Sequence, residues 1–393
     1  MRLSTIVVGG GIGGLSLARE LTIAGLPVVV LERAPKLATV GAGIIMNPNA
    51  MGVLEANGLA ACVRSRSAPY LVRDTFDHRG RPLARRDYRP LYARGRLAVG
   101  ALLHRAHLQE CLHDGLPAGT VRLDARIVAL DAGPEGVRVE TEGGEAFTGD
   151  VLIGADGIRS NVRLRFFRAN EPAYLGYRSH RFVVPNPDGL EHFTEFLGRG
   201  RRVGLVPIGG GQLYVWTTFN SSLESRAWAL ESADALRMAF GEFSDSRVRR
   251  AFDSLTSTEG VLCTDIEEVE QPRWASGRVA LLGDAAHALT PNMGQGAGMA
   301  MEDAVVLAGE LVKADRGETD VPAALTAYAA RRQQRVDTIA RLSRQIGEEG
   351  QLTGALACWL RNRRVSRAGR ATERVQASLA DLLAWPPPDE ARR

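Results

Sequence analysis

The stretch LSTIVVGGGIGG, residues 3–14, decides the fold class. Its first half is a short apolar run rich in β-branched residues, which is typical of a strand buried on both faces of a parallel sheet. Its second half satisfies the pattern G-x-G-x-x-G, and an apolar helical stripe follows and ends at Gly25. A second apolar run, Val28–Leu31, then stops at Glu32. Together these segments predict a complete strand–helix–strand unit of the dinucleotide-binding kind.

The glycines of this unit suit a bound pyrophosphate. They permit a tight turn and close approach of the backbone to the ligand, which then sits at the positive end of the helix. Glu32 lies 18 residues after Gly14 at the end of the second strand, where its carboxylate can accept hydrogen bonds from ribose hydroxyls. The strand and helix on either side disfavour a glycine-rich turn without a ligand. The pattern alone does not separate NAD from FAD.

The charge balance argues against a nucleic-acid-binding protein. The 393 residues include 49 Lys and Arg against 45 Asp and Glu, a net charge of +4, and only Lys36 and Lys313 are lysines. Nucleic-acid binding favours a basic stripe interleaved with aromatic residues. The densest cluster contains no aromatic residue and is interpreted as a solvated helix face: Arg361, Arg363, Arg364, Arg367, Arg370 and Arg374.

Cysteine usage and the amino terminus indicate a cytoplasmic protein. Cys62, Cys111, Cys263 and Cys358 are scattered, without a C-x-x-C pair or the spacing of metal ligands, so we expect no metal site and no disulfide–dithiol chemistry. The first residues lack the pattern of a signal peptide, and no apolar run is long enough to span a membrane. We therefore expect no membrane partner and a monomer or homodimer.

The rest of the chain alternates between two patterns. Residues 102–116 read as a helix and 121–148 as a short β-meander. Two further apolar runs, 151–156 and 279–282, predict buried parallel strands that end in Asp156 and Asp284. Between them, alternating residues predict antiparallel strands at 177–184, 192–197, 202–207 and 212–220.

Two segments resemble signatures of the flavin-dependent aromatic hydroxylases, the p-hydroxybenzoate hydroxylase-like family. GADGIRSNVR at 154–163 resembles their D-G motif, and GDAAH at 283–287 with PNMGQG at 291–296 resembles their G-D motif and flavin-ring loop. With the first glycine motif, three signatures stand in the family's order, and the resemblance covers residues 3 to about 343. One departure is Gly298, where the family often carries Asn.

The resemblance implies FAD as the cofactor and NADH or NADPH as co-substrate. It implies that Glu32 binds the adenosine ribose, Arg105 the phosphates or ribityl chain, and Asp284 the ribityl hydroxyls, while Asp156 shapes the cofactor and nicotinamide region. The predicted cofactor-binding residues are Gly9, Gly11, Gly13, Gly14, Glu32, Arg33, Gly43, Arg105, Asp156, Asp284, Pro291, Gly294, Gln295, Gly296 and Ala297. His287, beside this set, is interpreted as a structural histidine rather than a catalytic one.

The last antiparallel strand offers candidate substrate contacts. Alternation puts Tyr214, Trp216 and Thr218 on one face and Leu213, Val215 and Thr217 on the other, and either face could line a pocket. An aromatic substrate gains from stacking and from a phenolic partner. The candidate catalytic residues are the loop residues Pro291, Gly294 and Gly296 together with Tyr214, Trp216 and Arg202.

The predicted fold class is α/β (α+β), a Rossmann-like FAD-binding domain with an interleaved antiparallel-sheet substrate domain and C-terminal helices. The predicted boundaries are 1–70, 101–170 and 273–320 for the FAD-binding domain, and 71–100 and 171–272 for the substrate domain. A helical region with a frayed tail is expected at 321–393.

The function that the resemblance implies is a monooxygenase that consumes NAD(P)H and O₂ and hydroxylates an aromatic or electron-rich small molecule through a C4a-hydroperoxyflavin. A reductase, saturase or epoxidase of the same superfamily is an alternative, and a non-catalytic flavin-binding regulator is one from another class. The W-x-W-x-I signature of flavin halogenases is absent. The sequence leaves open the substrate, the choice between NADH and NADPH, and the group that activates the substrate.

Overall fold

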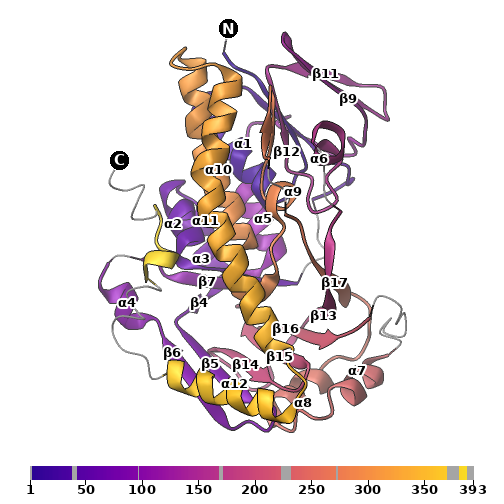
Figure 1. The fold of residues 1–393 in the computed structure, drawn as a ribbon, viewed down its shortest axis with the longest axis vertical. Coiled ribbons are helices and arrows are strands. Elements are labelled where there is room, and N and C mark those ends of the chain that lie inside the picture. Colours follow the sequence, from indigo (N-terminus) through magenta and orange to yellow (C-terminus); the bar gives the residue numbers. More distant parts are fainter. Residues whose placement is uncertain are drawn as a thin grey trace. The chain divides into compact units, whose positions relative to one another are not determined.

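The computed structural model describes residues 2–37, 42–95, 97–167, 171–222, 232–270, 273–369 and 380–386 (Figure 1). By their contacts, the residues divide into two compact units, each assembled from separate stretches of chain. Unit 1 comprises residues 1–39, 108–173 and 267–343, and unit 2 comprises 40–107, 174–266 and 344–393. Arg370, Arg374 and the end of the predicted tail, 387–393, lie outside the described residues.

A six-stranded sheet forms the centre of unit 1, and only its first strand is antiparallel to its neighbour. The order is β18 (Ala275–Ser276), β19 (Val279–Leu281), β12 (Val151–Gly154), β1 (Thr5–Val8), β2 (Val28–Leu31) and β8 (Val121–Arg122). Chain order therefore reverses between β1 and β12, which is the point where open parallel sheets bind ligands. All four residues of β1 and of β12 are buried, as the continuous apolar runs predict.

Two helices pack side by side against this sheet in unit 1 (Figure 1): α1 (Ile12–Ile23) and α10 (Gly296–Asp315). The short helices α6 (Asn161–Phe166) and α9 (Asp284–His287) follow β12 and β19, and the 3-10 turn η1 (Pro291–Met293) precedes α10. The β-meander predicted at 121–148 is only partly a separate sheet: β8 at its start joins the six-stranded sheet, and the separate sheet consists of β9 (Ile127–Gly133), β10 (Gly136–Thr141) and β11 (Ala146–Gly149).

A seven-stranded sheet dominates unit 2. Its order is β17 (Leu262–Glu268), β13 (Ala173–Pro185), β16 (Gln212–Asn220), β15 (Arg201–Pro207), β14 (Phe193–Leu197), β5 (Val72–Asp77) and β6 (Pro82–Asp87). The four antiparallel strands predicted from alternation are thus confirmed. No strand was predicted at β5 or β6, because their arginine-rich residues do not alternate cleanly between apolar and polar.

One face of this sheet is covered by α7 (Ala233–Ala239) and α8 (Ser246–Asp253). Leu213, Val215 and Phe219 of β16 join the apolar cluster beneath these helices. Tyr214 and Trp216 belong to a second cluster on the opposite face. Of the two faces that the sequence left open, the Tyr214 face is therefore the one that α7 and α8 leave uncovered.

A prediction that fails concerns residues 102–116. Residues 102–104 belong to strand β7 (Gly100–His104), and the helix α5 spans only Arg105–His113. The strand forms because β3 (Gly43–Met46) and β4 (Ser67–Tyr70) pair with its two edges. Such long-range pairing leaves no local signal, whereas the apolar spacing of the following helix extends back into the strand.

The contact-based units also differ from the predicted domain boundaries. Residues 42–70, expected in the FAD-binding domain, fold into unit 2 because β3 and β4 pair with β7 and because α2 (Pro48–Ala56) and α3 (Ala60–Ser65) accompany them. The predicted C-terminal helical region contributes to both units, since the division falls within α11 (Val321–Gly350). Unit 2 also holds α4 (Arg89–Ala93) and α12 (Ala355–Ala368).

Candidate active site

The turn between β1 and α1 depends on glycine at three positions. Gly9 has a positive φ of 108°, and a Cβ there would lie 2.4 Å from the carbonyl oxygen of Ala155. A Cβ on Gly14 would lie 2.0 Å from the Gly9 oxygen, and one on Gly13 would lie 2.5 Å from Leu282. These glycines allow β1, β12 and α1 to approach one another closely, which is the packing role of such a motif.

Gly11 differs from its neighbours because its side-chain position faces open space. No heavy atom lies within 4 Å of a Cβ built there, and its φ of −73° suits any residue. Gly11 is the N-cap of α1, and no side chain caps this helix. The first N–H groups of a helix need partners and carry positive potential, so the open space in front of α1 suits a phosphate.

Glu32 lies beside this turn at the end of β2. Its carboxylate accepts hydrogen bonds from the backbone N–H groups of Gly10 at 2.7 Å and Ala34 at 2.9 Å. Each carboxylate oxygen keeps a further lone pair, so the side chain can still accept a ribose hydroxyl. The neighbouring Arg33 is exposed.

A second uncapped helix terminus stands at α10. Gln295 is its buried N-cap, no side chain caps the helix, and Gly294 before it adopts the left-handed conformation. Pro291, Gly296 and Ala297 are at least partly exposed along this loop and first turn. The backbone N–H groups of Gly296 and Ala297, in the first turn of the helix, are therefore available to an anionic or hydrogen-bond-accepting ligand.

The carboxylate of Asp284 faces this terminus. Asp284 is exposed although Gly283 and Ala285 on either side are buried, and it accepts no hydrogen bond from any described residue. One of its oxygens lies 3.9 Å from the Cβ position of Gly296. An acid at the end of a buried strand with no protein partner is a good acceptor for the hydroxyls of a ligand.

Asp156 is used differently from Asp284. Its carboxylate accepts the Ser160 hydroxyl and the backbone N–H of Asn161, the latter at 2.7 Å, so it fixes the start of α6. Burial raises the pKa of Asp156 above its usual value, although these hydrogen bonds oppose the shift. If Asp156 acts near the cofactor as predicted, it does so by holding the loop after β12 in place.

The D-G and G-D motifs are joined by a buried arginine. Arg163 is 1% exposed and donates from Nη1 to the carbonyl oxygen of Ala285 at 2.9 Å and from Nη2 to that of Ile158. Burial lowers the pKa of Arg163. The two loops, separated by more than 100 residues in sequence, are therefore tied together by one side chain.

A buried charge network that the sequence did not reveal supports the G-D motif. Asp303 on α10 accepts from the Gly283 N–H at 3.2 Å, from His287 Nε2 at 2.5 Å and from Arg332 Nε at 2.8 Å. Glu302 pairs with Arg332 at 2.8 Å, and both acids are fully buried. As predicted, His287 is a buried structural histidine. The only sequence signal was an adjacent Glu and Asp within an apolar helix.

The features of unit 1 fit an FAD molecule. Two uncapped helix termini offer N–H donors for phosphate and flavin oxygens, and Gly11 leaves room for the pyrophosphate of FAD. Glu32 and Asp284 offer acceptors for ribose and ribityl hydroxyls. No group of three or more His, Cys, Asp or Glu in the described part of the chain is arranged to hold a metal ion.

Unit 2 holds the remaining predicted site residues. Gly43 lies against the ring of Tyr214, since a Cβ on Gly43 would lie 2.4 Å from that ring. Gly204 lies against Trp216 in the same way, since a Cβ on Gly204 would lie 2.0 Å from the Trp216 ring. Arg105 is the exposed first residue of α5, and its N–H donates to the Ala42 carbonyl at 3.1 Å. The absence of a side chain at Gly43 and Gly204 thus allows the rings of Tyr214 and Trp216 to lie directly against the backbone.

An aromatic cluster surrounds Trp216 on this face. Phe193 lies 6.4 Å from Trp216 edge to face, and Tyr70 lies 6.0 Å from Phe193. Tyr70 lies 5.0 Å from Tyr88. Tyr70, Tyr88 and Phe193 are buried in one apolar cluster, and Trp216 packs against it while only partly buried.

Arg202 is occupied by structural contacts. It is 2% exposed, donates to Thr218 at 3.2 Å and to Glu195 at 3.4 Å, and lies 5.5 Å above the Trp216 ring. Arg73 also pairs with Glu195, and the two guanidinium groups hold the pKa of this buried carboxyl below its usual value. This geometry does not support the predicted catalytic role of Arg202.

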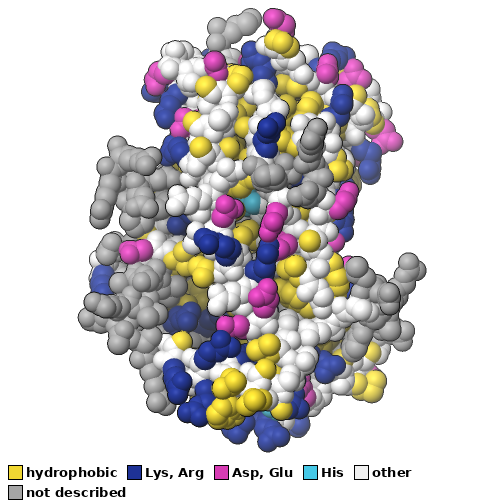
Figure 2. All heavy atoms as spheres, viewed as in Figure 1, with side chains coloured by type: hydrophobic (Ala, Val, Ile, Leu, Met, Phe, Trp, Pro, Cys, Tyr) yellow, Lys and Arg dark blue, Asp and Glu magenta, His cyan; other side chains and the backbone are white. Residues whose placement is uncertain are grey.

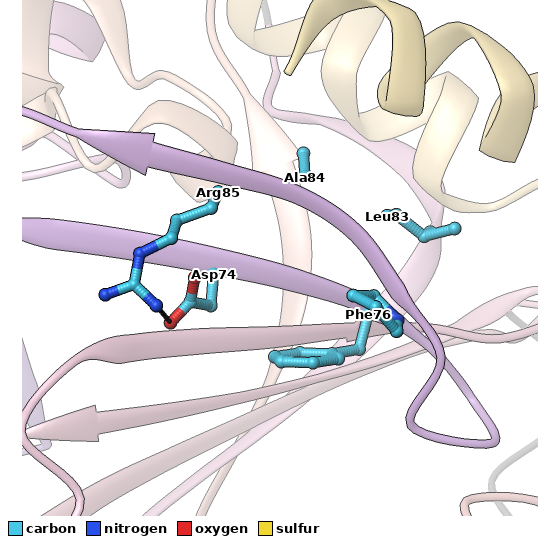
Figure 3. Close-up of a pocket in the computed structure, with 6 residues that line it drawn as sticks. Asp74, Phe76, Leu83, Ala84 and Arg85 are labelled. Atoms are coloured by element: carbon cyan, nitrogen blue, oxygen red, sulfur yellow. Dashed lines mark ion pairs between the residues drawn. The ribbon is translucent and has the colours of Figure 1, made fainter. Parts of the chain in front are cut away.

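A pocket of about 270 Å³ lies elsewhere in unit 2, on the β5–β6 hairpin (Figure 3). It is lined by Asp74, Phe76, Pro82, Leu83, Ala84 and Arg85, and Arg85 pairs with Asp74 at 3.7 Å. None of the predicted site residues lines this pocket, so it is not the candidate active site.

Comparison with known proteins decides the family. The family model described as "FAD binding domain" matches residues 2–343. The chain belongs to this family. It is an FAD-binding enzyme whose relatives are FAD-dependent aromatic hydroxylases, in agreement with the fold class, cofactor and reaction type predicted above.

Two relatives match this chain along nearly their whole length. Aurachin C monooxygenase/isomerase of Stigmatella aurantiaca is 36% identical, over 96% of this chain and 98% of the relative. The 2-heptyl-3-hydroxy-4(1H)-quinolone synthase of Pseudomonas aeruginosa is 32% identical, over 95% and 96%. Among solved structures, Klebsiella pneumoniae HpxO complexed with FAD and uric acid is 28% identical with a TM-score of 0.85, covering 97% of this chain and 96% of that chain.

Proposed function

We propose that this enzyme uses NADH or NADPH and molecular oxygen to hydroxylate a planar, fused heteroaromatic ring that carries an oxygen substituent, of the 4-quinolone type. FAD, when bound, supplies the hydride acceptance and oxygen activation that no side chain offers. The chain's own residues then bind the cofactor, orient the substrate and exclude water.

The observation that carries the proposal is a pair of polar groups on the aromatic face of unit 2. Tyr214 is 7% exposed, and its hydroxyl has no hydrogen-bond partner among the described residues. Burial raises the pKa of Tyr214, while the nearby charges of Arg181 and Arg105 oppose the shift. The phenol is therefore protonated at neutral pH and can donate a hydrogen bond to a substrate oxygen.

Arg181 supplies a positive charge beside this phenol. It stands opposite Trp216 in the register of β13 and β16, and Val183 stands opposite Tyr214. Its one polar contact within the described residues is a long hydrogen bond from Nε to Ser179 at 3.4 Å, and no carboxylate neutralises it. Arg181 thus differs from Arg73 and Arg202, which share Glu195.

Together these groups suit a ring that reacts with an electrophilic oxygen. An oxyanion on the ring makes the neighbouring carbon electron-rich, and a cation beside that oxygen favours its ionised form. The aromatic cluster binds the ring face, while Tyr214 and Arg181 bind its oxygen. The relatives named as a 4-quinolone synthase, a 3-hydroxybenzoate hydroxylase and a protein complexed with uric acid all point to rings that carry oxygen.

A substrate panel tests this proposal. Purified FAD-loaded enzyme is given a 2-alkyl-4-quinolone, 3-hydroxybenzoate or urate, and NAD(P)H oxidation and incorporation of labelled oxygen from O₂ are measured. We expect the quinolone to give the highest coupled turnover, with one labelled atom in the product. Stoichiometric hydrogen peroxide with unlabelled product for every compound that accelerates NAD(P)H oxidation would point instead to the reductase alternative.

Substitution of Arg181 tests the role of the charge. A charged hydrogen bond contributes about 1.5–3 kcal/mol, so R181Q should raise KM for the quinolone roughly ten- to a hundredfold while the FAD content stays unchanged. R199Q is the matched control, because Arg199 is an exposed arginine of the same unit. If R181Q and R199Q give the same KM, the substrate oxygen does not meet Arg181.

A further inference from the structure

The helix α12 of unit 2 is firmly held through one side. Arg361 is 2% exposed and donates to the carbonyl oxygens of Gly198 at 3.0 Å and Gly350 at 3.3 Å. Cys358, also buried, donates from Sγ to Leu352, and α12 packs along β6. These contacts fix which side of the helix faces outward.

The outward side is a continuous stripe with two chemically distinct halves. Its first half is apolar: Leu356 is 69% exposed, Trp359 52% and Leu360 47%. Its second half is cationic, with exposed Arg363, Arg364 and Arg367. These residues recur at helical spacings of three and four, so they share one face.

The charges of this stripe are largely uncompensated. α12 contains four arginines and no acidic residue. Arg364 pairs with the partly exposed Glu349 at 3.5 Å, and Arg363 lies 4.7 Å above the Trp359 ring. Arg363 and Arg367 have no carboxylate partner among the residues that the structure describes. At the foot of Figure 2, where Figure 1 places α12, hydrophobic side chains lie beside dark blue basic ones.

We propose that the outward stripe of α12 docks this enzyme on the surface of an anionic lipid bilayer. Leu and Trp side chains insert at the boundary between headgroups and acyl chains, and arginines pair with phosphates. The contact is peripheral, because none of the helices in the described part of the chain has the length and apolar character needed to span a membrane. It adds a partner that the sequence led us not to expect.

A second copy of the chain is a poorer occupant of this stripe. Most homodimers are two-fold symmetric, so the patch would meet itself. A parallel pair of α12 helices would bring the cationic halves together, and an antiparallel pair would set each cationic half against an apolar one, so neither gives the arginines an acidic partner from α12. Like charges in an interface cost binding energy, whereas an anionic surface neutralises all three arginines at once. The proposal does not depend on the substrate proposed above.

Vesicle sedimentation tests the proposal with the full-length, FAD-loaded enzyme. The vesicles contain phosphatidylcholine alone or equal parts of phosphatidylcholine and phosphatidylglycerol. We expect sedimentation with the anionic vesicles only, and release as salt is raised, because salt screens the arginine charges. Binding equal for both vesicles, or absent from both, overturns the proposal.

Two variants assign the binding to the two halves of the stripe. Combined L356S, W359S and L360S should abolish sedimentation, and combined R363Q, R364Q and R367Q should weaken it by roughly fivefold for each arginine removed. M238S and R199Q are controls, since Met238 is 79% exposed on α7 and Arg199 is an exposed arginine of the same unit. FAD absorbance and NAD(P)H oxidation confirm that each variant is folded.

The outcomes separate the lipid surface from a second copy. Vesicle binding retained by both combined variants overturns the assignment to α12. A dimer in sedimentation equilibrium that L356S, W359S and L360S dissociate, with no vesicle binding by the unaltered chain, identifies a second copy as the occupant. Loss of vesicle binding in both combined variants but not in the controls supports the proposal.

Discussion

Glu32 and Asp284 are both carboxylates that follow parallel strands, yet their surroundings differ. Glu32 accepts two backbone hydrogen bonds within the protein, from Gly10 and Ala34. Asp284 accepts none from the described residues and is exposed next to the first turn of α10. We therefore propose that Glu32 serves both the fold and the ligand, whereas Asp284 serves the ligand alone.

This difference predicts separable effects of substitution. D284N should weaken FAD binding about ten- to a hundredfold, the equivalent of about 1.5–3 kcal/mol, and leave the stability of the apoprotein unchanged. E32Q should weaken FAD binding and also lower apoprotein stability. Fluorescence titration with FAD and thermal unfolding of the apoprotein measure the two effects. D131N, at an exposed aspartate of β9, should change neither; equal loss of stability in D284N and E32Q would contradict this assignment.

At the scale of the element, the turn from β1 to α1 contains two kinds of glycine. Gly9 has a positive φ and no room for a Cβ, whereas Gly11 has an ordinary φ and open space. G9A should therefore destabilise the apoprotein, by several kcal/mol if the contact with Ala155 cannot relax. G11A should leave apoprotein stability within about 0.5 kcal/mol and reduce FAD affinity, because its methyl group occupies the space predicted for the ligand.

Urea unfolding of the apoproteins and FAD titration distinguish these two outcomes. G309A, within α10 and outside the predicted site, serves as a second glycine-to-alanine control, because no heavy atom lies within 4 Å of a Cβ built there. FAD affinity of G11A equal to that of the unaltered chain would show that the pyrophosphate does not pass Gly11.

Strands could be predicted where the pattern of their own residues identifies them. The strands β1, β2, β12 and β19 are short apolar runs because both their faces are covered, and turn residues or acids end them. β5, β6 and β7 were missed because their pairing partners, not their composition, make them strands. The same holds for the site: glycines and acids in motifs were found, whereas Asp303 with Arg332 and Glu195 with Arg73 required the fold.

At the scale of the whole molecule, each unit is stabilised by a buried carboxylate. Although burial raises both values, His287 and Arg332 hold the pKa of Asp303 in unit 1 below its usual value of 3.8, and Arg73 and Arg202 hold the pKa of Glu195 in unit 2 below its usual value of 4.5. A depressed pKa in the folded state contributes stability that is complete above the unfolded value and is lost as pH falls through the folded value. Both units should therefore lose stability in acid.

We expect E195Q to lower the free energy of unfolding by about 3–5 kcal/mol near neutral pH, because it leaves the charges of Arg73 and Arg202 without their shared carboxylate. D303N should lower it by less, because Arg332 keeps its ion pair with Glu302. The difference in free energy of unfolding between each variant and the unaltered chain should narrow as pH falls below the usual pKa of the carboxyl groups, because Asp303 and Glu195 then become protonated. Urea unfolding at several pH values measures this. The effects should add in the double variant, since the sites lie in different units. A gap that stays constant with pH would show that neither carboxylate titrates with unfolding.

Arg163 makes the D-G and G-D motifs structurally dependent on each other. Its guanidinium joins the loop after β12 to the Ala285 carbonyl after β19, from a position with 1% exposure. A side chain too short to reach would leave that carbonyl without its donor, and lysine would have to serve both carbonyls from one nitrogen where Arg163 uses two. In a chimera built from two relatives, residues 154–163 and 283–287 should therefore be exchanged together, because a crossover between them separates the arginine from the loop whose carbonyl it binds.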